Sequence, residues 1–165
     1  MQHTPAPTLE AVLAQYGASL ARVARTYEAT AAGREDLLQD VALALLKALP
    51  RYRGDSALGT FVYRVATNVA IDRLARRPPD ALDLAAIEDR PDPGPTPESL
   101  HADEHRRERL ARALRRLPLT QRQVMSLVLE GLSHGQIAAV LGLTENNVAV
   151  RANRARTQLR QWLEE

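Results

Sequence analysis

The 165-residue sequence contains no cysteine, which excludes disulfide bonds, thiolate metal sites and cysteine nucleophiles. Long apolar runs are also missing. The longest unbroken one, Val41 to Leu46, is far too short to cross a bilayer. The N-terminus has no basic stretch leading into an apolar one, so we expect no export signal and a cytoplasmic location. With 45% hydrophobic residues, the chain can still fold one ordinary domain or two small ones.

Net charge is also nearly absent, because 22 basic residues offset 20 acidic ones to leave +2. The distribution along the chain is uneven, however. Residues 1–79 carry +3, residues 80–104 carry −7 and residues 105–165 carry +6. Arginine supplies all the basic residues except Lys47. Its planar side chain is well suited to phosphates and base edges, although a high-GC genome would produce the same bias.

The acidic segment is also rich in proline, with six of the ten prolines between residues 78 and 97. Proline lacks an N–H donor and fixes φ, which disfavours both helices and central strands. We therefore predict an extended linker over residues 80–104. The linker separates two modules, residues 1–79 and residues 105–165.

Both modules show apolar residues at helical spacing and no sustained alternation typical of strands. In the first module, helices are expected around residues 9–27, 37–46 and 62–69, with Thr60 as N-cap of the third. The sequence therefore predicts an all-α protein made of two small helical domains.

The second module has clear helix boundaries. Thr120 with Gln123, and Ser133 with Gln136, are predicted to form capping boxes. Residues 142–144, Gly-Leu-Thr, form a tight turn between a short helix, 134–141, and a longer one, from about 145 to 162. Two helices joined by a short glycine-containing turn are typical of a helix-turn-helix, whose second helix enters a DNA major groove. The apolar residues of the longer helix, 145 to 162, share one face. The other side carries the candidate DNA contacts: Asn146, Asn147, Val150, Arg151, Asn153 and Arg154.

Residues 117–159, LPLTQRQVMSLVLEGLSHGQIAAVLGLTENNVAVRANRARTQL, resemble region 4 of the extracytoplasmic-function (ECF) sigma factors. Residues 36–77, DLLQDVALALLKALPRYRGDSALGTFVYRVATNVAIDRLARR, resemble region 2 of the same family. The resemblance implies a subunit that binds core RNA polymerase through the β′ clamp helices and the β flap, and that directs initiation at promoter DNA. It also implies control by an anti-sigma factor and no enzymatic activity of the chain's own.

The resemblance further assigns roles to individual residues. The core-polymerase contacts would be Asp36, Gln39, Asp40, Leu43 and Lys47. The −10 element would be melted and read by Arg51, Arg53, Phe61, Tyr63, Arg64, Thr67, Asn68, Arg73, Arg76 and Arg77, although Phe61 stands where the family usually has tryptophan, and Phe61 and Tyr63 equally suit a core. The −35 element would contact the second helix of the helix-turn-helix, whose Asn147 and Ala149-Val150 depart from the usual family residues. Val150 can touch a thymine methyl but cannot donate a hydrogen bond, so an altered promoter preference is expected.

Two other interpretations remain open. A helix-turn-helix transcriptional regulator would share the second module but leave residues 36–77 unexplained. A sigma-like decoy could sequester an anti-sigma factor without starting transcription. His101 and His105 stand at helical spacing but lack the adjacent glutamate of a zinc-protease helix and an evident third ligand. We therefore expect neither a metal nor a cofactor.

Overall fold

The structure, a computed structural model, describes residues 4–78 and 98–165 and shows seven α-helices and no strand among them. The first group is α1 (Leu9–Arg25), α2 (Ala31–Ala48), the short 3₁₀ helix η1 (Leu49–Arg51) and α3 (Leu58–Ala75). The second group is α5 (Glu98–Arg116), α6 (Leu119–Leu129), α7 (His134–Leu141) and α8 (Glu145–Glu164). The predicted all-α class is confirmed. No helix in these two ranges is both long and apolar enough to cross a membrane.

Helices α1, α2 and α3 pack around a core of aliphatic side chains, including Val12, Leu37, Leu45 and Val62. Threonine hydroxyls at positions 8 and 30 accept backbone N–H bonds at the starts of α1 and α2, as N-cap residues do. The rings of Tyr16 and Tyr63 meet edge to face between α1 and α3, with centroids 5.9 Å apart. The bundle therefore presents α2 and the η1–α3 loop on defined outer surfaces.

The second group builds the helix-turn-helix that the sequence predicts. Ser133 and Gln136 form the expected capping box of α7, and Gly142 ends that helix with a φ of 68°. Thr144 caps α8 by accepting the N–H of Asn147 at 3.1 Å. Against α8, α5 adds a contact between the Arg116 guanidinium and the Trp162 ring, 4.2 Å from its centroid.

Two helix starts differ from the sequence predictions. Helix α3 begins at Leu58, before Thr60, where Gly59 lies so close to the Tyr16 hydroxyl that an added Cβ would be 3.2 Å away. Helix α6 begins at Leu119 with Pro118 as its N-cap residue and no side-chain cap, so the predicted Thr120 capping box is wrong. The start of α3 is therefore set by packing and not by Thr60. The start of α6 is set by the fixed φ of Pro118 and not by Thr120.

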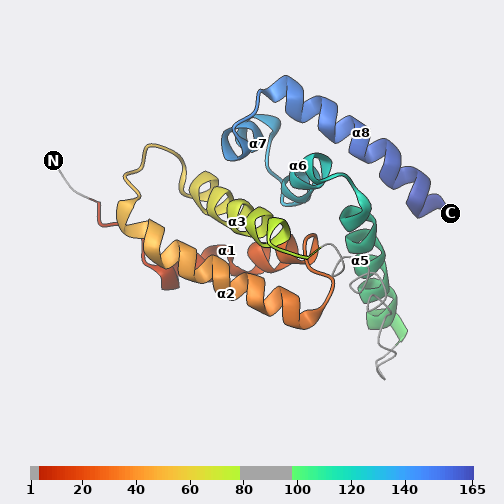
Figure 1. Ribbon diagram of the computed structural model, residues 1–165, viewed down its shortest axis with the longest axis horizontal. Coiled ribbons are helices and arrows are strands. Elements are labelled where there is room, and N and C mark those ends of the chain that lie inside the picture. Colours follow the sequence, from red (N-terminus) through yellow and green to blue (C-terminus); the bar gives the residue numbers. More distant parts are fainter. Residues whose placement is uncertain (1–3, 79–97) are drawn as a thin grey trace.

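The predicted linker is shorter than expected where the structure describes it, because α5 already starts at Glu98. Residues 80–97 of that linker lie outside the described residues. The two groups of helices are packed together (Figure 1), with α3 against α7 and a single cluster of buried apolar residues running through both. We call this packing of the two groups of helices the closed arrangement.

Candidate nucleic-acid and polymerase interface

Helix α2 exposes a mixed apolar and polar face. Leu43 and Leu46 are each 55% exposed, although leucine side chains of core helices are usually buried. The predicted contacts Asp36, Gln39 and Lys47 are also exposed, and their spacing places them beside Leu43. The sequence analysis did not predict Leu46 as a polymerase contact, although it lies three residues after Leu43. Exposed leucines flanked by charges form a surface suited to another helix.

Asp40, the remaining predicted polymerase contact, is placed differently. It is half-buried and accepts a hydrogen bond from Arg73 on α3 at 2.9 Å. Asp40 therefore connects the α2 face with the helix predicted to read the −10 element.

The loop between η1 and α3 carries exposed arginines on a fixed backbone. The Tyr52 hydroxyl donates to the Ser56 carbonyl at 2.6 Å, and its ring packs on Phe61 with centroids 5.0 Å apart. Gly54 has a φ of 79°, which favours glycine at this turn. Arg51 and Arg53 are exposed on either side of Tyr52, so their side chains are free to meet phosphates.

The predicted −10 residues on α3 and at its C-cap residue, Arg76, differ in exposure. Asn68 and Arg76 are exposed, whereas Tyr63 and Thr67 are buried, Thr67 with only 2% exposure. Arg64 is exposed, but its guanidinium donates to the Ala139 carbonyl of α7 at 2.7 Å. The closed arrangement thus leaves part of this helix accessible and covers another part.

Arg73 and Arg77 surround an acidic residue that sequence analysis did not single out. Glu28 is 4% exposed, and its carboxylate pairs with Arg73 at 3.4 Å and also with Arg77. Burial lowers the pKa of Arg73, but the hydrogen bond to Asp40 and the charge of Glu28 outweigh that effect and raise it. A Cβ on Gly33 would lie 2.6 Å from a Glu28 carboxylate oxygen, so this glycine leaves room for the ion pairs. Such a network depends on tertiary contacts and has no signal in helical spacing.

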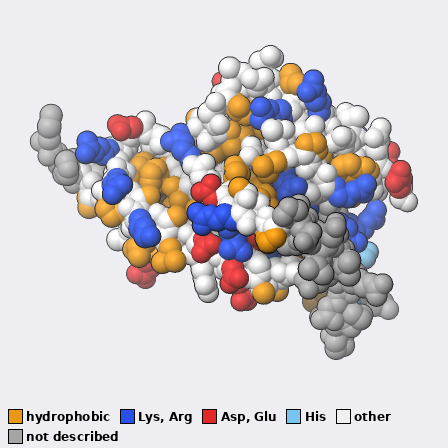
Figure 2. All heavy atoms as spheres, in the orientation of Figure 1, with side chains coloured by type: hydrophobic (Ala, Val, Ile, Leu, Met, Phe, Trp, Pro, Cys, Tyr) orange, Lys and Arg blue, Asp and Glu red, His pale blue; other side chains and the backbone are white. Residues whose placement is uncertain are grey.

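Helix α8 presents the predicted −35 residues at the surface. Asn146, Asn147, Asn153 and Arg154 are exposed, Val150 is 38% exposed, and Arg151 is half-buried. The opposite face of α8 is buried against α6 and α7. Lys and Arg side chains occur over both groups of helices on the face shown in Figure 2, rather than in one patch. The amide and guanidinium groups on α8 can donate to base edges, and Val150 offers a methyl contact.

A second polar cluster, which the sequence analysis also did not predict, joins the two groups of helices. Glu130 follows α6, its side chain is 6% exposed, and it accepts hydrogen bonds from Arg22 Nε and Nη2, both at 2.9 Å. Ser19 donates to the same carboxylate at 2.5 Å, and the Tyr63 hydroxyl lies 2.5 Å from the Ser19 oxygen. The hydrogen bond to Glu130, followed by its negative charge, raises the pKa of Arg22.

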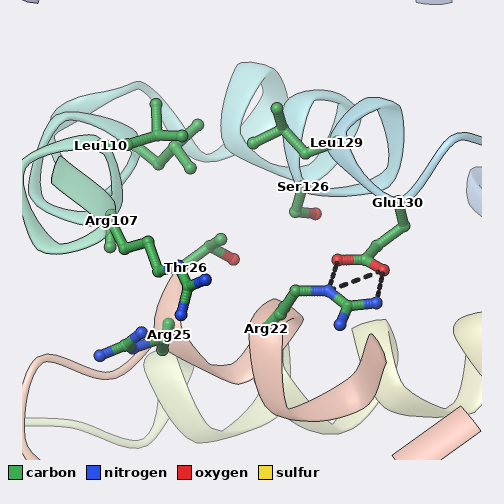
Figure 3. A pocket seen from close by; sticks show the side chains of 10 residues that line it. Arg22, Arg25, Thr26, Arg107, Leu110, Ser126, Leu129 and Glu130 are labelled. Atoms are coloured by element: carbon green, nitrogen blue, oxygen red, sulfur yellow. Dashed lines mark hydrogen bonds and ion pairs between the residues drawn. The ribbon is translucent and has the colours of Figure 1, made fainter. Parts of the chain in front are cut away.

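A pocket of about 260 Å³ lies beside this cluster. Figure 3 shows Arg22, Arg25 and Thr26 on one side, facing Leu110 of α5 and Leu129 of α6 on the other. Its walls come from both groups of helices, so it exists only while they remain together. Among the described residues, no group of three or more His, Cys, Asp or Glu side chains could hold a metal ion.

Comparisons with known proteins agree with this arrangement of two helical modules. Residues 12–78 match the family model "Sigma-70 region 2" and residues 107–159 match "Sigma-70, region 4". The ECF RNA polymerase sigma-E factor of Escherichia coli (strain K12) is 36% identical over 132 residues, covering 73% of this chain and 69% of the relative. The ECF RNA polymerase sigma factor SigM of Mycobacterium tuberculosis is 32% identical over 149 residues, covering 87% and 71%.

Two solved structures share the fold. CnrH in complex with the cytosolic domain of CnrY superposes with a TM-score of 0.70 at 25% identity, covering 94% of this chain and 87% of CnrH. The sigma factor RpoE in complex with the anti-sigma factor NepR from Bartonella quintana also gives 0.70, at 20% identity, covering 92% and 94%. Both likenesses extend over the two groups of helices.

Proposed function

Because the chain belongs to the ECF family of RNA polymerase sigma factors, we propose that its two modules divide the recognition of a promoter between them. The protein is an alternative sigma factor that directs transcription initiation. In our proposal, residues 1–79 bind core polymerase and open the −10 element, and residues 105–165 bind the −35 element and the β flap. The intervening residues connect these modules.

The observation that carries this proposal is the two-faced character of α8. One face is buried against α6 and α7, and the other exposes Asn146, Asn147, Asn153 and Arg154. The left-handed Gly142 and the Thr144 cap fix the angle between α7 and α8. A rigid turn followed by a helix with free amide and guanidinium groups is what major-groove contact requires.

Core polymerase would bind the exposed face of α2. Leu43 and Leu46 would pack on the β′ clamp helices, and Asp36, Gln39 and Lys47 would provide polar contacts around them. Burial of two leucines from water can supply most of the binding energy of a small helix contact, while the charges set orientation. Asp40 would act less directly, through its hydrogen bond to Arg73.

The −10 element would contact the η1–α3 loop and the exposed part of α3. Strand separation requires that an unstacked base be held by the protein, and Asn68 lies on the surface where it can donate to such a base. Arg51, Arg53 and Arg76 would hold phosphates. Phe61 supports Tyr52 and the loop, and the buried Tyr63 supports the helix from inside.

Regulation would come from a protein partner. RpoE of Bartonella quintana was solved with the anti-sigma factor NepR, and we propose that an anti-sigma protein also controls this chain. The chain itself would carry out no chemistry, because phosphodiester bonds are made by the polymerase. Its place of action would be the cytoplasm, where polymerase and promoters are found.

Run-off transcription tests the proposal. The full chain, added to core polymerase with a pool of random promoter fragments, should enrich templates with a defined pair of elements and yield transcripts from them. Asn146→Ala with Arg154→Ala should abolish that enrichment, whereas Gln161→Ala on the same helix should not. A chain that binds polymerase but yields no transcript would be a decoy. A chain that works only with another sigma factor would be a helix-turn-helix regulator.

A further inference from the structure

The pocket between α1, α5 and α6 has no role in the proposed function, because none of the residues that line it is assigned to a polymerase or promoter contact. One wall is apolar and comes from α5 and α6. Leu114 and Ala111 are buried, with 2% and 5% exposure. Leu110 is half-buried and Leu129 is 49% exposed. Covering these two leucines with an apolar molecule would remove them from water, which is favourable.

The two hydroxyl groups that line the pocket are hydrogen-bond acceptors only. The Thr26 hydroxyl donates its proton to the Val23 carbonyl at 2.7 Å, and the Ser126 hydroxyl donates to the Gln123 carbonyl at 2.9 Å. A hydroxyl has one proton, so neither oxygen has a second one to donate to a ligand. An anionic group placed against Thr26 or Ser126 would lose its hydration without gaining a hydrogen bond. The charged end of a bound anion must therefore lie elsewhere in the pocket.

One end of the pocket carries two guanidinium groups suited to an anion. Figure 3 shows Arg25 and Arg107 at this end, whereas Glu130 lies at the other end, where it is paired with Arg22. The Arg107 side chain is 71% exposed, and its contact with Glu104 is 4.0 Å long. Arg25 also pairs with Glu104, which is 53% exposed. Because exposed ion pairs contribute little, Arg25 and Arg107 can bind another carboxylate at small cost.

The volume of the pocket, about 260 Å³, limits the size of the ligand. A protein cavity of about 150 Å³ holds one benzene molecule, so this pocket has room for about ten non-hydrogen atoms. We propose that the pocket is a binding site for a small amphipathic carboxylate. Its apolar body lies against Leu110 and Leu129, and its carboxylate accepts hydrogen bonds from Arg107 and Arg25. Such a site adds ligand binding to the proposed function and does not depend on the polymerase or promoter contacts.

Isothermal titration calorimetry of the full chain with octanoate tests the site. Octanoate joins an apolar chain of the right size to one carboxylate, and we expect a dissociation constant of the order of 0.1 mM. Octan-1-ol has the same apolar chain without the charge, and octylammonium carries the opposite charge. Both should bind at least tenfold more weakly than octanoate, because neither can form charge-assisted hydrogen bonds with guanidinium groups. Acetate, which has the carboxylate but almost no apolar body, should give no saturable binding.

Two substitutions test the two ends of the ligand. Arg107→Gln should weaken octanoate binding about tenfold, by removing a charged donor. The matched control is Arg106→Gln on the same helix, because Arg106 is 75% exposed, has a similar contact with Asp103 at 3.6 Å and does not line the pocket. Leu129→Ser should weaken binding about fivefold, by removing part of the apolar wall. Circular dichroism checks that each variant keeps its helices.

Three results would overturn the proposal: no saturable binding of octanoate in the millimolar range, equal affinity for octanoate and octan-1-ol, or equal losses of affinity in Arg107→Gln and Arg106→Gln. Amide chemical shifts in nuclear magnetic resonance spectra give the location, and octanoate should move those of Thr26 and Leu129. Shifts confined to other parts of the chain would also contradict the assignment. Run-off transcription without added carboxylate tests the proposed function separately, since it requires no ligand in this pocket.

Discussion

Replacing Glu28 by glutamine should destabilise the first module strongly. The Glu28 side chain is only 5% exposed and pairs with Arg73 and Arg77, each about one-quarter exposed. Glutamine keeps the shape that fits over Gly33 but leaves both guanidinium groups without this counter-charge, and turns an N–H₂ donor toward them. The perturbation therefore tests the ion pairs and not the packing.

The expected loss of stability depends on the partial exposure of Arg73 and Arg77. Breaking a fully buried ion pair costs about 3–5 kcal/mol, because the surviving charge stays out of water. Here water can reach both arginines, and Arg73 keeps its 2.9 Å bond to Asp40, so the loss should be smaller. We expect the free energy of unfolding to fall by about 2–3 kcal/mol, of the order of two charge-assisted hydrogen bonds less the recovered hydration.

Urea unfolding followed by circular dichroism measures this loss. With a denaturant slope of about 2 kcal/mol/M, the midpoint should fall by roughly 1–1.5 M. The control is Glu35→Gln on α2, which makes the same chemical change at an exposed residue and should stay within about 0.5 kcal/mol. If the two variants unfold at the same urea concentration, the assignment of Glu28 as a structural counter-ion is wrong.

Four further substitutions test the proposed surfaces. Arg76→Ala should weaken −10 strand binding by polymerase holoenzyme and reduce the slope of log affinity against log salt by about one, with unchanged thermal stability. Arg77→Ala should lower the melting temperature, because Arg77, unlike Arg76, pairs with Glu28. Arg154→Ala should weaken binding to −35 duplexes by about 1–3 kcal/mol at fixed salt and leave core-polymerase affinity intact, as measured by fluorescence anisotropy. Leu46→Asp should reduce core-polymerase affinity at least tenfold in the same assay without lowering the melting temperature, since this leucine is already exposed.

Each of these substitutions has a contrary outcome. Equal melting temperatures for Arg76→Ala and Arg77→Ala would mean that the ion pair to Glu28 contributes nothing. Unchanged duplex affinity of Arg154→Ala would remove it from the −35 surface. A Leu46→Asp chain that binds polymerase normally would place the polymerase contact elsewhere on the bundle.

Local patterns in the sequence predicted the features that depend on neighbouring residues. The Ser133–Gln136 capping box, the Gly142 turn and the Thr144 cap all form as expected, because each is satisfied within a few residues of the chain. Thr60 and Thr120 looked equally suitable as caps but lie inside helices. The position of a helix start depends on tertiary packing, on proline and on capping hydroxyl groups. Proline and hydroxyl residues can be read from a sequence, but tertiary packing cannot.

The sequence predicted the placement of site residues that lie free on the surface, but not of those that are hydrogen-bonded to distant parts of the chain. Asn146, Asn153 and Arg154 lie on the outer face of α8 because helical periodicity alone places them opposite its apolar residues. Arg64 and Arg73 belong to an equally regular pattern, yet their partners, the Ala139 carbonyl and Glu28, are 75 and 45 residues away. Spacing within one helix carries no information about such contacts.

This difference changes which arginines can contribute to DNA affinity. A guanidinium that is already paired with a carboxylate must give up that bond before it can bind a phosphate, so its net gain is small. Arg51, Arg53 and Arg76 have no ion pair within the part of the chain that the structure describes, and they face water. Phosphate contacts formed by these three release counter-ions without breaking an internal bond. The salt dependence of −10 binding should therefore reflect these three free arginines, and the pairing of Arg73 and Arg77 should appear in stability instead.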